Sequence, residues 1–338
     1  MDIINIFVGL DYHQSGVQVC ILDQSGNVLS NRFLANSWKE IQIHVEHYGN
    51  CVQAAIESCS GAADIADELI QKAGWSVHLA HPGYVSRMKQ GPDKTDYSDA
   101  RLLADLVRVG YLPKVWLAPV EVREMRLLVR YRQQQVNQRR AIKLRMGAIL
   151  REQRIGSGPA RRWSMPWLLW VKTTLDLSPQ GRWVIERHFE DLEGLSRKIK
   201  ITEERLSLAC KEDALVIRLL TIKGVGPVTA WTLRAEVGRF DRFANGKQLA
   251  RFCGLSPRNA SSGNRQADAG LIMAANSQLR STLIELAHRV ARHDPRWRHL
   301  ASKLRKRGKP GSLVAAAVAN RWTRHLYNQL KIMPMNVA

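Results

Sequence analysis

Two aspartates make residues 93–106 the first candidate for chemistry. Thr95 can cap a helix that continues to Gly110 without a Gly or Pro. Asp96 and Asp99 are then expected on one face of its first turn. Carboxylates that close repel each other and tend to share a proton, unless a divalent cation lies between them. The alternative is that both acids only complement the positive end of the helix dipole.

Two more acids follow apolar runs that are typical of buried strands. Asp11 follows residues 3–10, and Glu57 follows residues 51–56. Acids at strand ends are costly to bury unpaired, so their convergence with the helical pair would favour a shared cation site. Two Mg²⁺ ions roughly 3.5–4 Å apart could activate a nucleophile and stabilise the leaving oxygen of a phosphodiester. Taken singly, Asp11 could be a turn residue and Glu57 a helix cap, and His13 is expected to be solvated or at the core edge rather than a ligand.

The elements that must position these acids are predicted by hydrophobic periodicity. Apolar or alternating runs bounded by turn residues predict strands, and amphipathic runs predict helices. In chain order, strands are expected over 3–10, 17–21, 28–34, 51–56 and 76–80, with helices over 37–48 and 63–73 and from residue 95. This β-β-β-α-β-α-β-α order is the ribonuclease-H-like arrangement, which would bring all four acids to one edge of a sheet.

The composition predicts a folded protein that binds a polyanion. The chain has 338 residues, enough for two or three domains, and 45% of them are hydrophobic. Lys and Arg outnumber Asp and Glu by 51 to 30, which gives a net charge of +21. Nucleic acid is therefore the first expected partner, ahead of a membrane, and a generally basic surface is the alternative.

The cysteines and apolar runs indicate a cytoplasmic protein. The five cysteines form no C-x-x-C pair, so neither a zinc site nor a disulfide framework is expected. The start of the chain carries no basic leader and no apolar stretch reaches eighteen residues, so we expect neither export nor a membrane span.

The middle of the chain is helical and basic. Residues 119–154 interleave apolar residues with cations that include Arg139 and Arg140, which predicts a helix with one packed seam and its other sides facing phosphates or solvent. A more evenly charged tract over 181–210 is expected to pack on it as a coiled-coil arm. Three tryptophans between them are expected in a core, with base stacking as the alternative: Trp163, Trp167 and Trp170.

Residues 220–230 predict a helix-hairpin-helix. Its turn contains Lys223, Gly224 and Gly226, and the glycines would let backbone N–H groups approach a phosphate at a helix N-terminus. An ordinary connection between two helices is the alternative.

The loop expected over 252–265 contains a pair of serines, Ser261 and Ser262. A loop serine is usually a turn residue, and it becomes a nucleophile only with a base, a metal or positive charge to activate it. Arg258 and Arg265 could supply that charge for a phosphate. A densely basic segment farther on adds two more candidate phosphate contacts, Arg305 and Arg307.

Motifs over nearly the whole chain resemble one family. They are G-L-D, I-E-S-C-S-G, K-T-D-Y-S-D-A-R-L-L-A, I-K-G-V-G-P-V-T-A and F-C-G-L-S-P-R followed by S-S-G. In this order and spacing they resemble the DEDD transposases of insertion-sequence family one-hundred-ten, including its eleven-eleven subgroup, which are also called bridge-RNA-guided recombinases. The chain departs from the family at Asp11-Tyr12-His13, where D-T or D-V is usual, and at 274–276, where a lysine-glycine pair is usual.

The resemblance implies an α/β + α fold in three parts. These are a ribonuclease-H-like (RuvC-type) DEDD domain over 1–118, a basic helical coiled-coil region over 119–211, and a mainly α-helical, serine-bearing transposase domain with the helix-hairpin-helix over 212–338. The family's metal-binding acids fall on Asp11, Glu57, Asp96 and Asp99. Its nucleophilic serine falls on Ser262 when counted from Pro257, and on Ser261 when counted back from Leu279.

The same resemblance implies a reaction and its partners. The serine would attack a DNA phosphate to give a phosphoserine, assisted by Mg²⁺, two ions per composite site, and a DNA 3′-hydroxyl would resolve the adduct. The implied partners are donor and target DNA and a structured noncoding guide RNA. Pairing of the acidic domain of one protomer with the serine domain of another implies a homodimer that assembles into a tetramer, acting at the nucleoid of a prokaryotic cell.

Three other functions stay open at this point. A Holliday-junction-resolvase-like endonuclease would use the same acids with water as the nucleophile, but it would have no use for the C-terminal half. A non-catalytic nucleic-acid scaffold would use the acids only as caps. An actin-like sugar kinase shares the core topology but needs glycine-rich phosphate loops, and none follows the first predicted strand.

Overall fold

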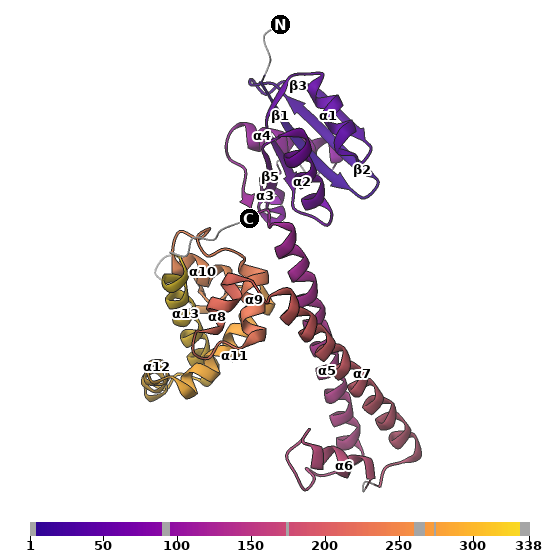
Figure 1. Cartoon of the computed structure of the whole chain (residues 1–338), viewed down its shortest axis with the longest axis vertical. Coiled ribbons are helices and arrows are strands. Elements are labelled where there is room, and N and C mark those ends of the chain that lie inside the picture. Colours follow the sequence, from indigo (N-terminus) through magenta and orange to yellow (C-terminus); the bar gives the residue numbers. More distant parts are fainter. Residues whose placement is uncertain (1–4, 90–94, 174–175, 260–267, 274, 332–338) are drawn as a thin grey trace. The chain divides into compact units, whose positions relative to one another are not determined.

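The computed structural model describes residues 5–89, 95–173, 176–259, 268–273 and 275–331. Contacts between residues divide the chain into two compact units, 1–118 and 119–338. The first unit is a sheet with helices, and the second is almost entirely helical (Figure 1). No helix in the described ranges is long and apolar enough to cross a membrane.

The first unit contains a six-stranded mixed sheet in the order β3-β2-β1-β4-β5-β6. The strands are β1 (Asn5–His13), β2 (Gly16–Leu22), β3 (Val28–Leu34), β4 (Asn50–Glu57), β5 (Val77–Ala80) and β6 (Lys114–Val115). β1, β2 and β3 pair antiparallel, β1, β4 and β5 pair parallel, and β6 is antiparallel to β5. This order fits the ribonuclease-H-like arrangement expected from the sequence. β6 is too short for a hydrophobic pattern to predict it.

Helices cover both faces of this sheet. They are α1 (Trp38–Glu46), α2 (Ala62–Ala73) and α4 (Asp96–Arg108). Side chains alternate between the faces of a strand, and Leu10 of β1 packs in the core with α1 and α2. Gly9 faces α4, and a Cβ on Gly9 would overlap the backbone oxygen of Ala100 in that helix. Gly9 thus sets the distance between β1 and α4, which together carry three of the four predicted acids.

A short helix, α3 (Pro82–Met88), precedes α4 and is not predicted from the sequence. Pro82 is its first residue, and the Nδ1 atom of His81 accepts a hydrogen bond from the Gly83 N–H at 3.1 Å. Seven residues are too few to show a helical hydrophobic period, so the pattern could not reveal this helix.

Two long helices dominate the first part of the second unit. α5 (Val120–Glu152) and α7 (Pro179–Ala209) pack along each other, and the short α6 (Met165–Thr173) lies at one end of the pair (Figure 1). Trp167 is only 1% exposed in their shared core, so it packs as expected and cannot stack on a base. The coiled-coil arm stays a prediction, since two packed helices alone do not establish a supercoil.

The rest of the second unit is a bundle of short helices with one hairpin. The helices are α8 (Ala214–Leu220), α9 (Pro227–Val237), α10 (Gly246–Phe252), α11 (Ser277–His293), α12 (Pro295–Lys306) and α13 (Gly311–Leu330). The first turns of α5 also belong here, because Met125 and Val129 are buried in the same core. α5 therefore passes through both parts of the unit, and the boundary expected at residue 211 stays a prediction.

The expectation of a continuous loop over 252–265 was wrong. Pro257–Asn259 form strand β7, which pairs antiparallel with β8 (Asp268–Leu271). A strand of three residues has no alternation of its own to recognise. It exists because a partner nine residues farther on satisfies its backbone groups.

Candidate metal centre and active site

The start of α4 positions two of the predicted acids. Thr95 is the N-cap, as expected: its Oγ1 accepts a hydrogen bond from the Ser98 N–H at 3.2 Å, and the Ser98 Oγ faces the Thr95 N–H at 3.3 Å. This capping box fixes Asp96 as the first helical residue and Asp99 one turn farther along. The acids are therefore held on a helix end whose backbone is satisfied independently of them.

Strand β1 brings a third acid and a histidine to the same place. The His13 Nε2 atom lies 3.3 Å from Asp11 Oδ2 and 3.4 Å from Asp96 Oδ1. These three side chains each offer one ligand atom, and the three atoms lie within 4.8 Å of one another. Asp11 and Asp96 are 85 positions apart in the sequence but close in the fold, which is an arrangement suited to holding a divalent cation.

The surroundings of Asp11 disfavour its negative charge. Burial raises the pKa of the Asp11 carboxyl above its usual value, nearby His13 lowers it, and the carboxylates of Asp99 and Asp96 raise it further. The effect of Asp99 on this pKa indicates that it lies within electrostatic reach of Asp11. A cation between the acids would remove this repulsion, so the residues present fit a metal ion.

Asp99 carries its own positive partner. Its side chain is 8% exposed, and one carboxylate oxygen lies 2.6 Å from the Lys89 Nζ atom. Lys89 follows α3 directly. Asp99 also lines a cavity of about 590 Å³ together with Lys89, Arg101 and Arg108. The lysine compensates a carboxylate that would otherwise be buried alone.

Glu57 lies on the strand beside Asp11. β1 and β4 run parallel with Leu10 opposite Ile56, so the side chains of the next residues, Asp11 and Glu57, project from the same face of the sheet. Glu57 is nevertheless outside the close group of ligand atoms formed by Asp11, His13 and Asp96 in the described residues. The structure thus brings Asp11 and Asp96 together, while Asp99 and Glu57 lie outside this close group.

His13 was expected in solvent or at the core edge, and its side chain is 41% exposed. Its ring nitrogen also faces two of the acids, a contact that was not predicted from the sequence. The period of two along a strand puts residues 11 and 13 on one face, and this signal could have found it. The distant partner Asp96 could not be inferred for His13 from local pattern.

Asp105 pairs with Arg108, 2.6 Å away and one turn along the same helix. Arg101 lines the cavity beside Asp99.

Comparisons with known proteins identify the family. The profile described as transposase, of the DEDD type of IS110, matches residues 8–154, and the profile described as transposase IS116/IS110/IS902 family matches residues 217–302. The first match contains all four predicted acids. The chain belongs to the IS110/IS116 family of DEDD transposases. The family resemblance seen in the sequence is therefore confirmed, and the chain is a transposase, an enzyme of DNA strand transfer.

Individual transposases are similar to this one over most of their length. A protein of Pseudomonas aeruginosa named “Probable family 20 transposase” is 28% identical over 331 residues, covering 95% of each chain. The transposase for insertion sequence element IS1111A of Coxiella burnetii is 27% identical, covering 93% of this chain and 86% of its own. The transposase for IS1328 of Yersinia enterocolitica is 26% identical, covering 83% and 82%.

The predicted nucleophile of the transposase falls on a stretch that the structure does not describe. Ser261, Ser262 and Arg265 lie outside the described residues. Arg258 is exposed on β7, which ends at Asn259, directly before the stretch that the structure does not describe. The choice between the two serines therefore stays as the sequence left it.

The other predicted nucleic-acid contacts of the transposase are distributed over its second unit. Lys223, Gly224 and Gly226 form the turn between α8 and α9. Gly224 has a positive φ of 90° and packs so closely on Val290 of α11 that a Cβ would collide with it. Packing against α11 therefore explains why residue 224 is a glycine, and phosphate binding at this turn stays a prediction.

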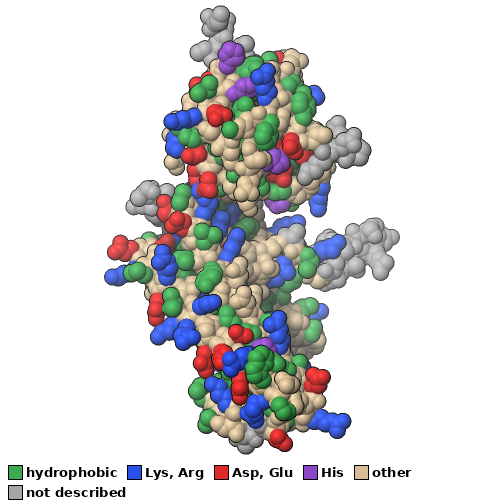
Figure 2. All heavy atoms as spheres, turned by 90° about the vertical axis from the view of Figure 1, so that its right-hand side faces the viewer, with side chains coloured by type: hydrophobic (Ala, Val, Ile, Leu, Met, Phe, Trp, Pro, Cys, Tyr) green, Lys and Arg blue, Asp and Glu red, His purple; other side chains and the backbone are tan. Residues whose placement is uncertain are grey.

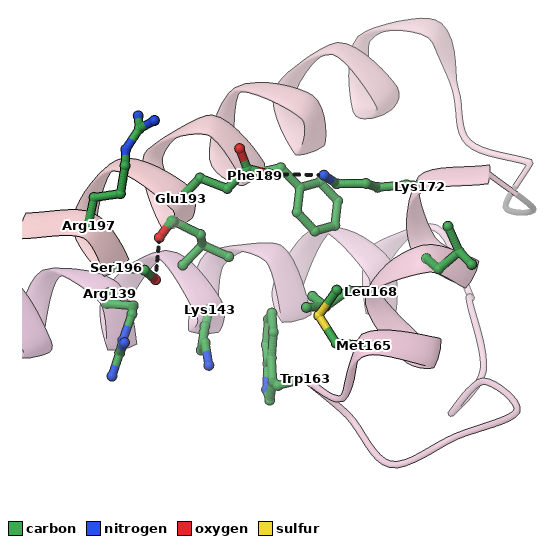
Figure 3. Close-up of a pocket in the computed structure, with 12 residues that line it drawn as sticks. Arg139, Lys143, Trp163, Met165, Leu168, Lys172, Phe189, Glu193, Ser196 and Arg197 are labelled. Carbon is green, nitrogen blue, oxygen red and sulfur yellow. Dashed lines mark hydrogen bonds and ion pairs between the residues drawn. The ribbon is translucent and has the colours of Figure 1, made fainter. Parts of the chain in front are cut away.

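The remaining cations lie on α5 and α12. Arg139 lines a cavity of about 570 Å³ between α5, α6 and α7, with Lys143, Trp163 and Phe189 (Figure 3). Arg140 lies beside it on α5, and Arg305 and Arg307 are exposed at the end of α12. Lys and Arg side chains are spread over the visible face rather than gathered in one patch (Figure 2).

Proposed function

We propose that the transposase cuts and rejoins insertion-sequence DNA with a serine nucleophile and metal ions held by four acids. Asp11 and Asp96 would hold one Mg²⁺, and Glu57 and Asp99 would complete the site for a second. When bound, the ions supply charge stabilisation for the attacking and leaving oxygens of a phosphodiester. The observation that carries the proposal is the meeting of Asp11 and Asp96, from β1 and α4, at one point.

The serine would transfer one DNA strand in two balanced steps. The Oγ of Ser262, or of Ser261, loses its proton and attacks the phosphorus, so a serine–phosphate bond forms, the bond to the DNA 3′-oxygen breaks, and that oxygen takes up a proton. In the second step a DNA 3′-hydroxyl loses its proton and attacks the phosphoserine, and the serine oxygen is released and takes up a proton. Each step replaces one phosphate ester bond by another. The energy of the phosphodiester bond is therefore conserved, and no external energy source is needed.

The cavity beside Asp99 supports the approach of a DNA backbone. Lys89, Arg101 and Arg108 line it, so it offers positive charge next to the acids. A phosphate that binds there would also compete with Asp99 for Lys89. This would free the Asp99 carboxylate for a cation when the substrate is bound.

Guide RNA and a tetramer belong to the same proposal and rest on the family resemblance. The net charge of +21 suits binding of nucleic-acid backbones. The candidate contacts lie on α5, the α8–α9 turn, β7 and α12, so they suit several strands better than one reading helix. Sequence reading would then be delegated to the RNA, with donor and target DNA paired to it, in a homodimer that assembles further.

Serine substitution tests the proposal. The double variant Ser261→Ala, Ser262→Ala should lose the covalent DNA adduct and all strand exchange, while it keeps the binding of divalent cations. Ser256→Ala is the matched control, since Ser256 precedes the same hairpin and its backbone oxygen accepts from the Ile272 N–H. Strand cleavage by the double variant at the wild-type rate would establish water as the nucleophile and support the resolvase-like alternative.

A further inference from the structure

The imidazole of His13 gives the acidic site a nitrogen donor. Its Nε2 atom lies 3.3 Å from Asp11 and 3.4 Å from Asp96. Two ligand atoms bound to one ion at about 2.1 Å are separated by roughly 3.0–3.4 Å in octahedral or tetrahedral coordination. Both nitrogen–oxygen separations fall in that range, and all three ligand atoms lie within 4.8 Å of one another, so one ion can contact all three side chains once they close around it.

The exposure of the three groups suits a site that stays open. The side chains of His13 and Asp96 are 41% and 51% exposed, while that of Asp11 is 16% exposed. Asp11 is thus the fixed ligand, and the other two border solvent. An ion held by them keeps positions for water or a phosphate oxygen, which catalysis requires.

The combination of one imidazole nitrogen with two carboxylate oxygens affects which metal ion binds best. Mg²⁺ takes oxygen ligands almost exclusively and keeps several waters, whereas imidazole nitrogen suits transition-metal ions. We propose that His13 is a third metal ligand, which makes the Asp11–His13–Asp96 group bind transition-metal ions such as Mn²⁺ in preference to Mg²⁺. This inference rests on the proposed metal site and adds a specificity-determining residue to it.

Metal binding by the whole protein tests the inference without reference to activity. The wild-type protein is titrated with Mn²⁺ and the bound ion is followed by electron paramagnetic resonance, with Mg²⁺ as competitor. Pulsed spectra of bound Mn²⁺ should show coupling to an imidazole ¹⁴N nucleus. His13→Ala should remove that coupling and weaken Mn²⁺ at least about tenfold while changing Mg²⁺ little.

Two further variants make the result decisive. His13→Asp replaces the nitrogen donor by oxygen and should shift the preference toward Mg²⁺. His47→Ala, on the turn after α1, is the matched control and should leave both affinities unchanged.

The outcomes separate this inference from the proposed function. If Asp11→Asn weakens both ions but His13→Ala weakens neither and the nitrogen coupling is absent, His13 only hydrogen-bonds the acids and the inference is wrong. If Asp11→Asn also leaves both affinities unchanged, the proposed metal site itself is wrong.

Discussion

Gly9→Ala tests whether close packing of α4 on β1 sets up the acidic site. A Cβ at residue 9 would lie 2.5 Å from the backbone nitrogen of Ala104 and would overlap the oxygen of Ala100. Because non-bonded heavy atoms prefer contacts of about 3.5 Å, α4 must retreat by roughly 1–1.5 Å. Overpacking of this kind lowers the free energy of unfolding by about 1–3 kcal/mol. The same shift moves Asp96 away from Asp11, and a displacement of 1 Å can lower a rate about 100-fold.

Two measurements on Gly9→Ala separate stability from site geometry. Chemical denaturation should show the loss of stability, and strand transfer, measured where the variant is fully folded, should fall about 100-fold. Gly194→Ala in α7 is the matched control: a Cβ there meets no atom within 4 Å, so it should stabilise the helix by about 0.5–1 kcal/mol. Wild-type stability and strand transfer in Gly9→Ala would refute the reasoning.

Two charge substitutions give the remaining predictions. Burial raises the pKa of the Asp11 carboxyl above its usual value of 3.8, so the folded protein binds this proton more tightly than the unfolded chain does. The protein therefore loses stability as the pH rises from 3.8 through the higher pKa of the folded state. In metal-free protein, Asp11→Asn should therefore be more stable than wild type at neutral pH, and urea denaturation should show the gain vanishing below pH 3.8. Lys89→Met leaves the carboxylate of Asp99 buried without its cation, so we expect a loss of about 3 kcal/mol that a saturating divalent cation partly restores.

An exposed ion pair provides the control for Lys89. Lys72 and Glu68 on α2 lie 2.7 Å apart with side chains 47% and 41% exposed, so Lys72→Met should change stability by less than about 0.5 kcal/mol. Equal losses from the two lysine variants would mean that Asp99 does not depend on Lys89. A lower stability of Asp11→Asn at neutral pH would mean that burial of the Asp11 charge is not unfavourable.

Much of the first unit could be predicted because its signals are local. The strands β1 to β5 show period-two or continuous apolar runs, and Thr95, a typical N-cap residue, predicts the start of α4. The helix α3 and the strands β6 and β7 could not be found, because each is too short to carry a period. They are defined by capping or by a distant partner.

The meeting of Asp11 and Asp96 could be predicted from the sequence, but the other contacts around them could not. Asp11 and Asp96 lie close together because β1 and α4 pack against each other at Gly9. Both elements have clear hydrophobic patterns in the sequence. The role of His13 depends on a contact over more than eighty residues, and the pairing of Lys89 with Asp99 depends on α3. Such contacts follow from tertiary packing, which no local pattern encodes.

Locating the bound ion tests the central claim most directly. Crystals of the protein soaked in Mn²⁺ should give an anomalous difference peak about 2.2 Å from the carboxylates of Asp11 and Asp96, and this peak should disappear in Asp11→Asn. The absence of a peak at Asp11 and Asp96 at saturating Mn²⁺, while the same protein still transfers DNA strands, would contradict the account.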